Sequence, residues 1–143
     1  MNDHADRVVP VFVGAAVRGG TLRVDGPNCA FDFTHIDDVG SGVVAVAGQL
    51  VAGEQRLPPI HFVSGRSTSL EELANRAIAA GNGRGRFVIA PPRNFDVHEF
   101  VGDPGRAKAL LGWQTTVTLE AGLLRYADLM RTHLPGDVER AGA

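Results

Sequence analysis

The sequence predicts a small α/β domain in which several helices pack against a small mixed sheet. Short runs with strand character alternate with longer segments whose apolar residues recur at helical spacing. Hydrophobic residues make up 44% of the 143 residues and charged residues 21%, a balance that matches an ordinary globular protein. The length suits one compact domain. Because the expected strands are few and short, the sheet must be small.

The first half of the chain predicts two helices and two short strands. In order, these are a helix over 8–17, a strand over 22–24, a strand over 33–36 and a helix from about 39 to 51. Gly19-Gly20 ends the first helix, and the turn residues of 25–28 separate the strands. Asp37 or Asp38 is expected to cap the second helix, since a carboxylate accepts hydrogen bonds from the free N–H groups there.

The second half predicts further strands and helices in alternation. In order, these are a strand over 60–63, a helix from 70 to about 81, a strand over 87–90, a short helix from 103 to 112 and a final helix over 119–134. The segment 68–71 is a capping box, and Thr118 caps the last helix, which carries a broad apolar stripe. Pro91-Pro92 forces an extended path. We expect one domain over 8–134, with flexible ends over 1–7 and 135–143.

Charge and cysteine content exclude several classes of partner. A formal charge of −2, from 14 basic and 16 acidic residues, provides no positive field for nucleic acid. The longest apolar stretch, around Val43 to Ala52, is interrupted and far shorter than the ~20 residues of a membrane span, so we expect no membrane. The single cysteine, Cys29, excludes an internal disulfide, and no signal peptide is evident. A cytoplasmic location is expected.

No motif for a dinucleotide cofactor is present. Such a motif needs a strand that leads through Gly-x-Gly-x-x-Gly into a helix. The glycines of 81–85 follow a predicted helix and precede a strand, which is the reverse order. We therefore interpret this segment as a helix end and turn.

Five blocks of sequence carry a family resemblance. They are Val9-Pro10-Val11-Phe12, Leu22 to Gly26, Asp32 to Val39, Ser64-Gly65 with Ser67 to Leu73, and Asp103 through Trp113. In order and approximate spacing, from about Val8 to Tyr126, they resemble the second half of extended short-chain dehydrogenase/reductases that act on nucleoside-diphosphate sugars, such as the UDP-glucose 4-epimerase group. The resemblance implies the substrate-binding domain of these enzymes, without their Rossmann domain.

The same resemblance implies where the cofactor belongs. In this family the first half is a Rossmann domain that holds NAD and carries a Tyr-x-x-x-Lys pair. Here the only tyrosine, Tyr126, is followed four positions later by Met130. We therefore expect no cofactor on this chain alone and no catalytic residue within it. NAD(P) is expected on a separate Rossmann-domain chain, and a fragment of a longer enzyme would have the same sequence features.

The resemblance also implies a set of nucleotide-binding residues. The family's Arg-x-x-Asp segment corresponds to Arg93 and Asp96, where a guanidinium suits the diphosphate and a carboxylate suits the ribose hydroxyls. The Val-Tyr-Gly step beside the base corresponds to Val24 and Asp25, so an acid stands where an aromatic residue is common. Phe31 replaces an arginine that would contact the diphosphate. Arg23 either supplies replacement charge or is a solvated strand residue.

Other polar groups favour structural roles over functional ones. His35, Asp37 and Asp38 are possible metal ligands, but we interpret the histidine as part of the small sheet and the aspartates as helix caps. The turn Ser64 to Ser67 is interpreted as a turn and cap rather than a phosphate site. Cys29 has no histidine nearby in the sequence and is interpreted as a structural thiol.

Two functions follow as hypotheses. The first is a nucleoside-diphosphate-sugar-binding subunit of an NAD-dependent epimerase or dehydratase that requires a separate cofactor-binding chain. The second is a non-catalytic nucleotide-binding or interaction module descended from such an enzyme, with Asp25 and Phe31 as signs of relaxed binding. Calorimetry with nucleoside diphosphates distinguishes the two.

Overall fold

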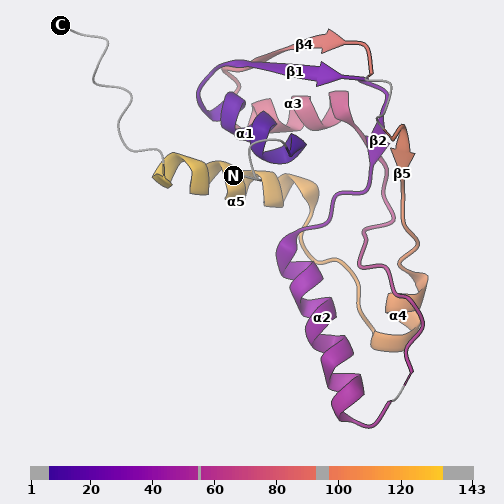
Figure 1. Cartoon of the computed structure of the whole chain (residues 1–143). Coiled ribbons are helices and arrows are strands. Elements are labelled where there is room, and N and C mark those ends of the chain that lie inside the picture. The colour runs from indigo at the N-terminus through magenta and orange to yellow at the C-terminus, as the bar shows by residue number, and fades with distance from the viewer. Residues whose placement is uncertain (1–6, 55, 93–96, 134–143) are drawn as a thin grey trace, which may run out of the picture.

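The chain folds into two adjoining parts, seen in a computed structural model that describes residues 7–54, 56–92 and 97–133. Helices α1 (Val8–Val17), α3 (Leu70–Ala80) and α5 (Leu119–His133) pack together beside the strands. Helices α2 (Ile36–Val51) and α4 (Gly105–Leu111) extend away from them and form a second part (Figure 1). Across the described ranges, no helix combines the length and the apolar character needed to cross a membrane.

Two small sheets accompany the helices. Strand β1 (Thr21–Asp25) pairs in parallel with β4 (Arg86–Ala90). Strand β2 (Ala30–Phe31) lies between β3 (Thr68–Ser69), which is antiparallel to it, and β5 (Glu99–Phe100), which is parallel. The prediction of an α/β domain with a small mixed sheet is therefore confirmed.

The hydrophobic core lies between β1 and the helices α1, α3 and α5. Its buried members are Phe12, Val13, Ala16, Leu22, Val24, Leu73, Ala74, Ala77, Ala80, Leu123 and Ala127. Small residues let the helices approach closely: a Cβ atom on Gly81, which ends α3, would lie 2.6 Å from the carbonyl carbon of Ala16 in α1. This approach explains why the glycine-rich segment forms a tightly packed helix end, as predicted.

The structure corrects two strand predictions. The predicted strand over 33–36 is wrong, because the strand β2 ends at Phe31 and Ile36 already begins α2. The predicted strand over 60–63 has no regular secondary structure and no strand partner among the described residues. In both segments the composition favours a strand, but pairing depends on neighbours that are distant in the sequence.

The helix caps agree with the sequence in part. Thr118 Oγ1 accepts from Ala121 N at 3.2 Å, as expected for the cap of α5. Ser69 caps α3 by accepting from Glu72 N at 3.1 Å, one residue later than the capping box predicted. The cap of α2 is His35, whose Nδ1 accepts from Asp37 N at 3.2 Å, so the aspartate caps were wrong.

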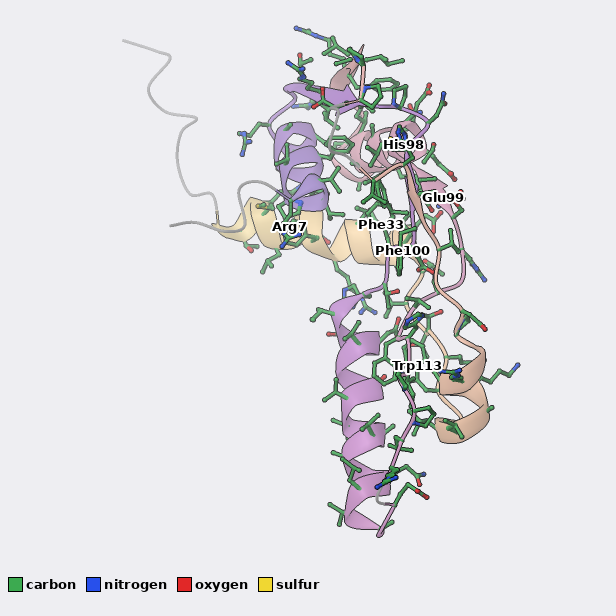
Figure 2. The ribbon with its side chains drawn as sticks, turned by 45° about the vertical axis from the view of Figure 1, so that its right-hand side comes forward. Arg7, Phe33, His98, Glu99, Phe100 and Trp113 are labelled. Atoms are coloured by element: carbon green, nitrogen blue, oxygen red, sulfur yellow. The ribbon has the colours of Figure 1, made fainter. Side chains whose placement is uncertain are left out.

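Trp113 holds the second part together. Its Nε1 donates to Asp38 O at 2.9 Å and to Ser41 Oγ at 3.0 Å, both in α2. Its ring meets Phe62 edge-on, with 5.0 Å between the ring centroids. The indole lies between α2 and α4 (Figure 2). This one side chain therefore joins α2, the segment around Phe62 and the end of α4.

Candidate functional site

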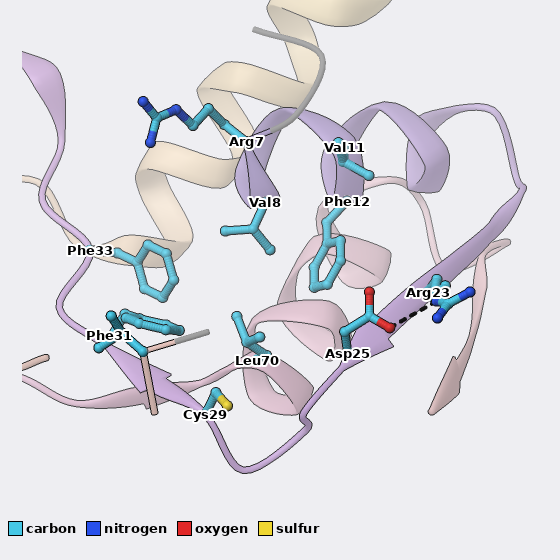
Figure 3. Close-up of a pocket in the computed structure, with 11 residues that line it drawn as sticks. Arg7, Val8, Val11, Phe12, Arg23, Asp25, Cys29, Phe31, Phe33 and Leu70 are labelled. Atoms are coloured by element: carbon cyan, nitrogen blue, oxygen red, sulfur yellow. Dashed lines mark hydrogen bonds and ion pairs between the residues drawn. The ribbon is translucent and has the colours of Figure 1, made fainter. Parts of the chain in front are cut away.

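A cavity of about 430 Å³ lies where the first turn of α1, the end of β1, strand β2 and the start of α3 meet. Its apolar wall consists of Val8, Val11, Phe12, Phe31, Phe33, Leu70 and Val97. Its polar groups are Arg7, Arg23, Asp25 and the thiol of Cys29 (Figure 3). A largely apolar cavity with a few convergent polar groups is the usual form of a small-molecule site.

Asp25 and Arg23 form an ion pair at one side of this cavity. The Arg23 Nε lies 2.8 Å from Asp25 Oδ1, and the two side chains are 71% and 25% exposed. Both residues are on β1, two positions apart, so they point to the same side of the strand. By the family resemblance, an aromatic residue is common at the position of Asp25. Here the ion pair takes its place. Arg23 therefore lines the cavity and is also engaged with Asp25.

Arg7 is a second cation at the cavity, and the sequence analysis missed it. It directly precedes α1 and its exposed side chain lines the cavity opposite Arg23 (Figure 3). Among the described residues it has no ion-pair partner. In the sequence, Arg7 belongs to the predicted flexible end over 1–7. Only folding brings the start of α1 beside β1, so the sequence carries no signal for this role.

Phe31 supplies part of the apolar wall. Its ring meets Phe33 at a centroid distance of 6.4 Å and an interplanar angle of 73°, an edge-to-face arrangement. Both rings line the cavity. The replacement of an arginine by Phe31 therefore exchanges a positive charge for an aromatic surface on which a flat ring can pack.

The other predicted binding residues fall elsewhere. Val24 has a side chain that is 0% exposed and belongs to the hydrophobic core, so it supports the strand rather than the cavity wall. Arg93 and Asp96 lie outside the described residues. Val97, which directly follows that segment, lines the cavity. Pro92, which directly precedes it, packs against the turn at Gly26, where a Cβ atom would lie 2.9 Å from Pro92 Cβ.

Asp32 fixes the turn that the sequence suggested as a weak phosphate site. Its Oδ1 accepts from Ser64 N at 2.9 Å and from Ser64 Oγ at 2.7 Å, and its Oδ2 accepts from Gly65 N at 2.7 Å. The N–H groups that would hold a phosphate are therefore already bound to a carboxylate. This agrees with the interpretation of the segment as a structural turn.

Asp38 is a structural carboxylate rather than a ligand or a cap. It is 2% exposed and accepts hydrogen bonds from Thr116 N, Thr116 Oγ1 and Val117 N at 2.7 to 3.1 Å. Burial raises the pKa of this carboxyl, but the hydrogen bonds from Thr116 and Val117 outweigh it, with a smaller contribution from His35, and the pKa is lowered. Within the described ranges no cluster of three or more His, Cys, Asp or Glu residues could hold a metal ion.

Cys29 has a histidine neighbour that is distant in the sequence. Its Sγ lies 3.8 Å from His98 Nδ1, and the thiol is 4% exposed. His98 directly precedes β5 and lies 69 positions after Cys29, so the sequence around Cys29 gives no sign of this neighbour. Cys29 lines the cavity, and its contact with His98 lies beside the backbone pairing of β2 with β5.

No family model matches the chain, but several known proteins are similar to it. The UDP-glucose 4-epimerase of Mycolicibacterium smegmatis is 28% identical over 125 residues, which are 87% of this chain and 39% of that protein. The enzyme of the same name from Neisseria meningitidis serogroup C is 34% identical over 102 residues, 70% of this chain and 29% of that protein. The solved UDP-glucose 4-epimerase of Thermotoga maritima with UDP-glucose is similar over 88% of this chain and 40% of its own, with a TM-score of 0.75 and 27% identity. The chain is therefore similar to the C-terminal region of UDP-glucose 4-epimerases, which is consistent with a C-terminal part of an extended short-chain dehydrogenase/reductase.

The match falls in one part of these relatives. The chain corresponds to the C-terminal region of the extended short-chain dehydrogenase/reductases, and it spans about 40% of the length of the Mycolicibacterium relative. The α/β fold with small mixed sheets is the fold of that region. Because the chain spans less than half of these relatives, their activity as whole enzymes is not shown for it.

Proposed function

We propose that the cavity between α1, β1 and β2 binds the nucleotide of a nucleoside-diphosphate sugar, and that the chain is the substrate-binding part of an NAD-dependent sugar epimerase or dehydratase. The similarity to UDP-glucose 4-epimerases supports the substrate class, since the solved structure from Thermotoga maritima contains UDP-glucose. In this proposal a separate Rossmann-domain chain binds the NAD(P) cofactor.

The observation that carries this proposal is the composition of the cavity. Two of the residues expected from the sequence, Asp25 and Phe31, line one space of about 430 Å³ together with two arginines. In the proposed complex the base packs on Phe31, and the positive charge of Arg7, which lines the cavity, attracts the diphosphate. Arg93 would bind the diphosphate and Asp96 the ribose hydroxyls, as the resemblance implies.

The described residues do not fit a dinucleotide cofactor. The strand β1 is followed by the turn at Gly26 and the strand β2, not by a helix whose N-terminus could hold a pyrophosphate. Gly81 and Gly85 lie against Ala16 of α1, so a ligand could not approach them from that side. Tyr126 packs against the hydrophobic core. Hydride transfer needs a bound nicotinamide, so in this proposal the chain binds and orients the sugar nucleotide only.

Calorimetry tests the binding role. The chain is titrated with UDP, UDP-glucose and the corresponding guanosine and thymidine compounds, and we expect at least one to bind with micromolar affinity. Loss of a bidentate arginine–phosphate contact costs about 1.5–3 kcal/mol, so Arg93→Ala should weaken binding by about 10-fold to 100-fold. The matched control is Arg84→Ala, because Arg84 is exposed and does not line the cavity.

The same titration separates the two hypotheses for this chain. Binding that Arg93→Ala weakens by about 10-fold to 100-fold and Arg84→Ala leaves unchanged supports a substrate-binding part. Absence of binding to every nucleoside diphosphate would contradict it and favour the non-catalytic interaction module.

A further inference from the structure

The cavity beside β1 has two ends that differ in charge. Arg7 provides a positive charge at one end, and Arg23 is joined to Asp25 at the other (Figure 3). Among the described residues that line the cavity, Asp25 carries the only acidic side chain. A negatively charged diphosphate is attracted to a cation and repelled by a carboxylate. The charges therefore favour a nucleotide with its diphosphate near Arg7 and its base near Asp25.

The carboxylate of Asp25 can accept further hydrogen bonds. Its Oδ1 accepts from Arg23 Nε at 2.8 Å, and in the described part of the chain this is the one hydrogen bond that it receives. A carboxylate has two oxygens and about four lone-pair sites, so most of its acceptor capacity is left. Figure 3 shows the second oxygen turned away from Arg23. The side chain is only 25% exposed, so a ligand with N–H donors meets an acceptor that is partly shielded from water.

The common nucleobases differ in what their edges offer to a carboxylate. Guanine carries two adjacent donors, N1–H and the 2-amino group, beside the acceptor O6. Uracil and thymine carry one donor, N3–H, between two carbonyl oxygens, so a carboxylate that accepts from N3–H lies against a second oxygen. Cytosine and adenine place an acceptor ring nitrogen next to their amino group. Guanine alone therefore forms two parallel N–H···O bonds with a carboxylate, the arrangement that makes charged hydrogen bonds strong and specific.

The guanidinium of Arg23 adds to this match. Its Nε is bound to Asp25, and its other N–H groups have no hydrogen-bond partner within the described ranges. The pair therefore presents donors beside two acceptor oxygens. The edge of guanine has the complementary pattern, with the acceptor O6 beside the donors N1–H and the 2-amino group. Both residues lie on β1, two positions apart, so the strand fixes the donor and the acceptors relative to each other.

We infer that the Arg23–Asp25 pair recognises the edge of a guanine, and that the ligand of this cavity is a guanosine-diphosphate sugar. The inference rests on the proposed function, because it names the base of the nucleotide proposed for the same cavity. The base packs on Phe31, which lies across the cavity from Asp25 (Figure 3), and the diphosphate extends towards Arg7. Asp25 is then a specificity-determining residue and not a sign of relaxed binding.

Calorimetry with three nucleoside diphosphates tests this inference. GDP and inosine diphosphate differ only in the 2-amino group, which inosine lacks, and UDP has a single donor on its base edge. Loss of one hydrogen bond to a charged acceptor weakens binding by about 10-fold to 100-fold, so GDP should bind at least about 10-fold more tightly than the other two. Asp25→Asn should remove this preference, because an amide supplies only one acceptor atom. The control Asp37→Asn should retain it, because that side chain is 66% exposed and does not line the cavity.

The outcomes separate this inference from the proposed function. Equal binding of GDP and inosine diphosphate by the wild-type chain would overturn the recognition of guanine, and so would tighter binding of UDP. Either result leaves nucleotide binding in place, so the proposed function would stand. A preference for GDP that persists in Asp25→Asn would also overturn the inference. Failure of all three compounds to bind would refute the proposed function and the base assignment with it. The comparison on the wild-type chain needs no substitution, so it decides the question even where Asp25→Asn does not fold.

Discussion

The replacement Asp38→Asn tests whether one buried carboxylate joins the two parts of the fold. Asp38 lies in α2, and its three hydrogen bonds come from Thr116 and Val117, in the segment that leads to α5. Asparagine has nearly the same shape but carries an acceptor at only one terminal atom. The change therefore removes charge and one acceptor without creating a cavity.

The cost can be worked out from these contacts. Asparagine keeps an oxygen for Thr116, but its amide N–H₂ then faces Val117 N, which donated at 3.1 Å to Asp38 Oδ2. A hydrogen bond to a charged group contributes about 1.5–3 kcal/mol, and an unsatisfied buried donor costs about 1–3 kcal/mol. Because the two effects overlap, we expect a loss of about 2–4 kcal/mol in the free energy of unfolding.

Urea unfolding measures this loss. With a slope of about 1.5 kcal/mol per molar urea, the unfolding midpoint should fall by about 1.3–2.7 M. The control is Asp37→Asn, because that side chain is 66% exposed and its Arg125 partner lies 3.4 Å away, so the loss should stay below about 0.5 kcal/mol. Equal losses for the two variants would refute the structural role of Asp38.

Three further outcomes are expected. The lowered pKa of Asp38 means that, as the pH falls, the unfolded chain binds a proton at the ordinary pKa of 3.8 before the folded chain does. The stability from this carboxylate is therefore complete above about pH 5 and is lost as the pH falls through the lowered pKa, so the difference in urea midpoint between wild type and Asp38→Asn should shrink as the pH falls below 3.8. Gly42→Ala should destabilise the fold by about 1–3 kcal/mol, because the added methyl group meets the ring of Phe62. Gly48→Ala should stabilise it by about 0.5–1 kcal/mol, because nothing lies within 4 Å of the added group and alanine favours the helix. Thermal unfolding measures both, and the reverse order of stabilities would contradict the packing of α2. Cys29, 4% exposed and at the cavity, should react with a thiol reagent more slowly still when UDP is bound, and an unchanged rate would argue against binding beside it.

The elements that could be predicted from the sequence are those with local signals. Helix α5 follows its Thr118 cap and apolar stripe, and β1 appears where residues 22–24 indicated a strand. The strand expected at 33–36 failed because pairing with β3 and β5 selects Ala30–Phe31 instead. Local composition does not contain that information.

The candidate site shows the same division. Asp25 and Phe31 were found through the family resemblance, and both line the cavity. Arg7 and the Cys29–His98 neighbourhood were missed, since each depends on segments brought together by folding. Asp38 had the position of a helix cap in the sequence, but its partners lie 78 and 79 residues further along.

A titration of the isotopically labelled chain with UDP, followed by NMR, tests the proposed binding site directly. The account predicts that amide signals of Val8, Asp25, Cys29, Phe31 and Leu70 shift together and saturate, because these residues line the cavity beside β1. Signals of the exposed α2 residues Val43, Val44 and Val51, which do not line the cavity, should stay in place. Shifts confined to other regions, or none at millimolar UDP, would contradict it.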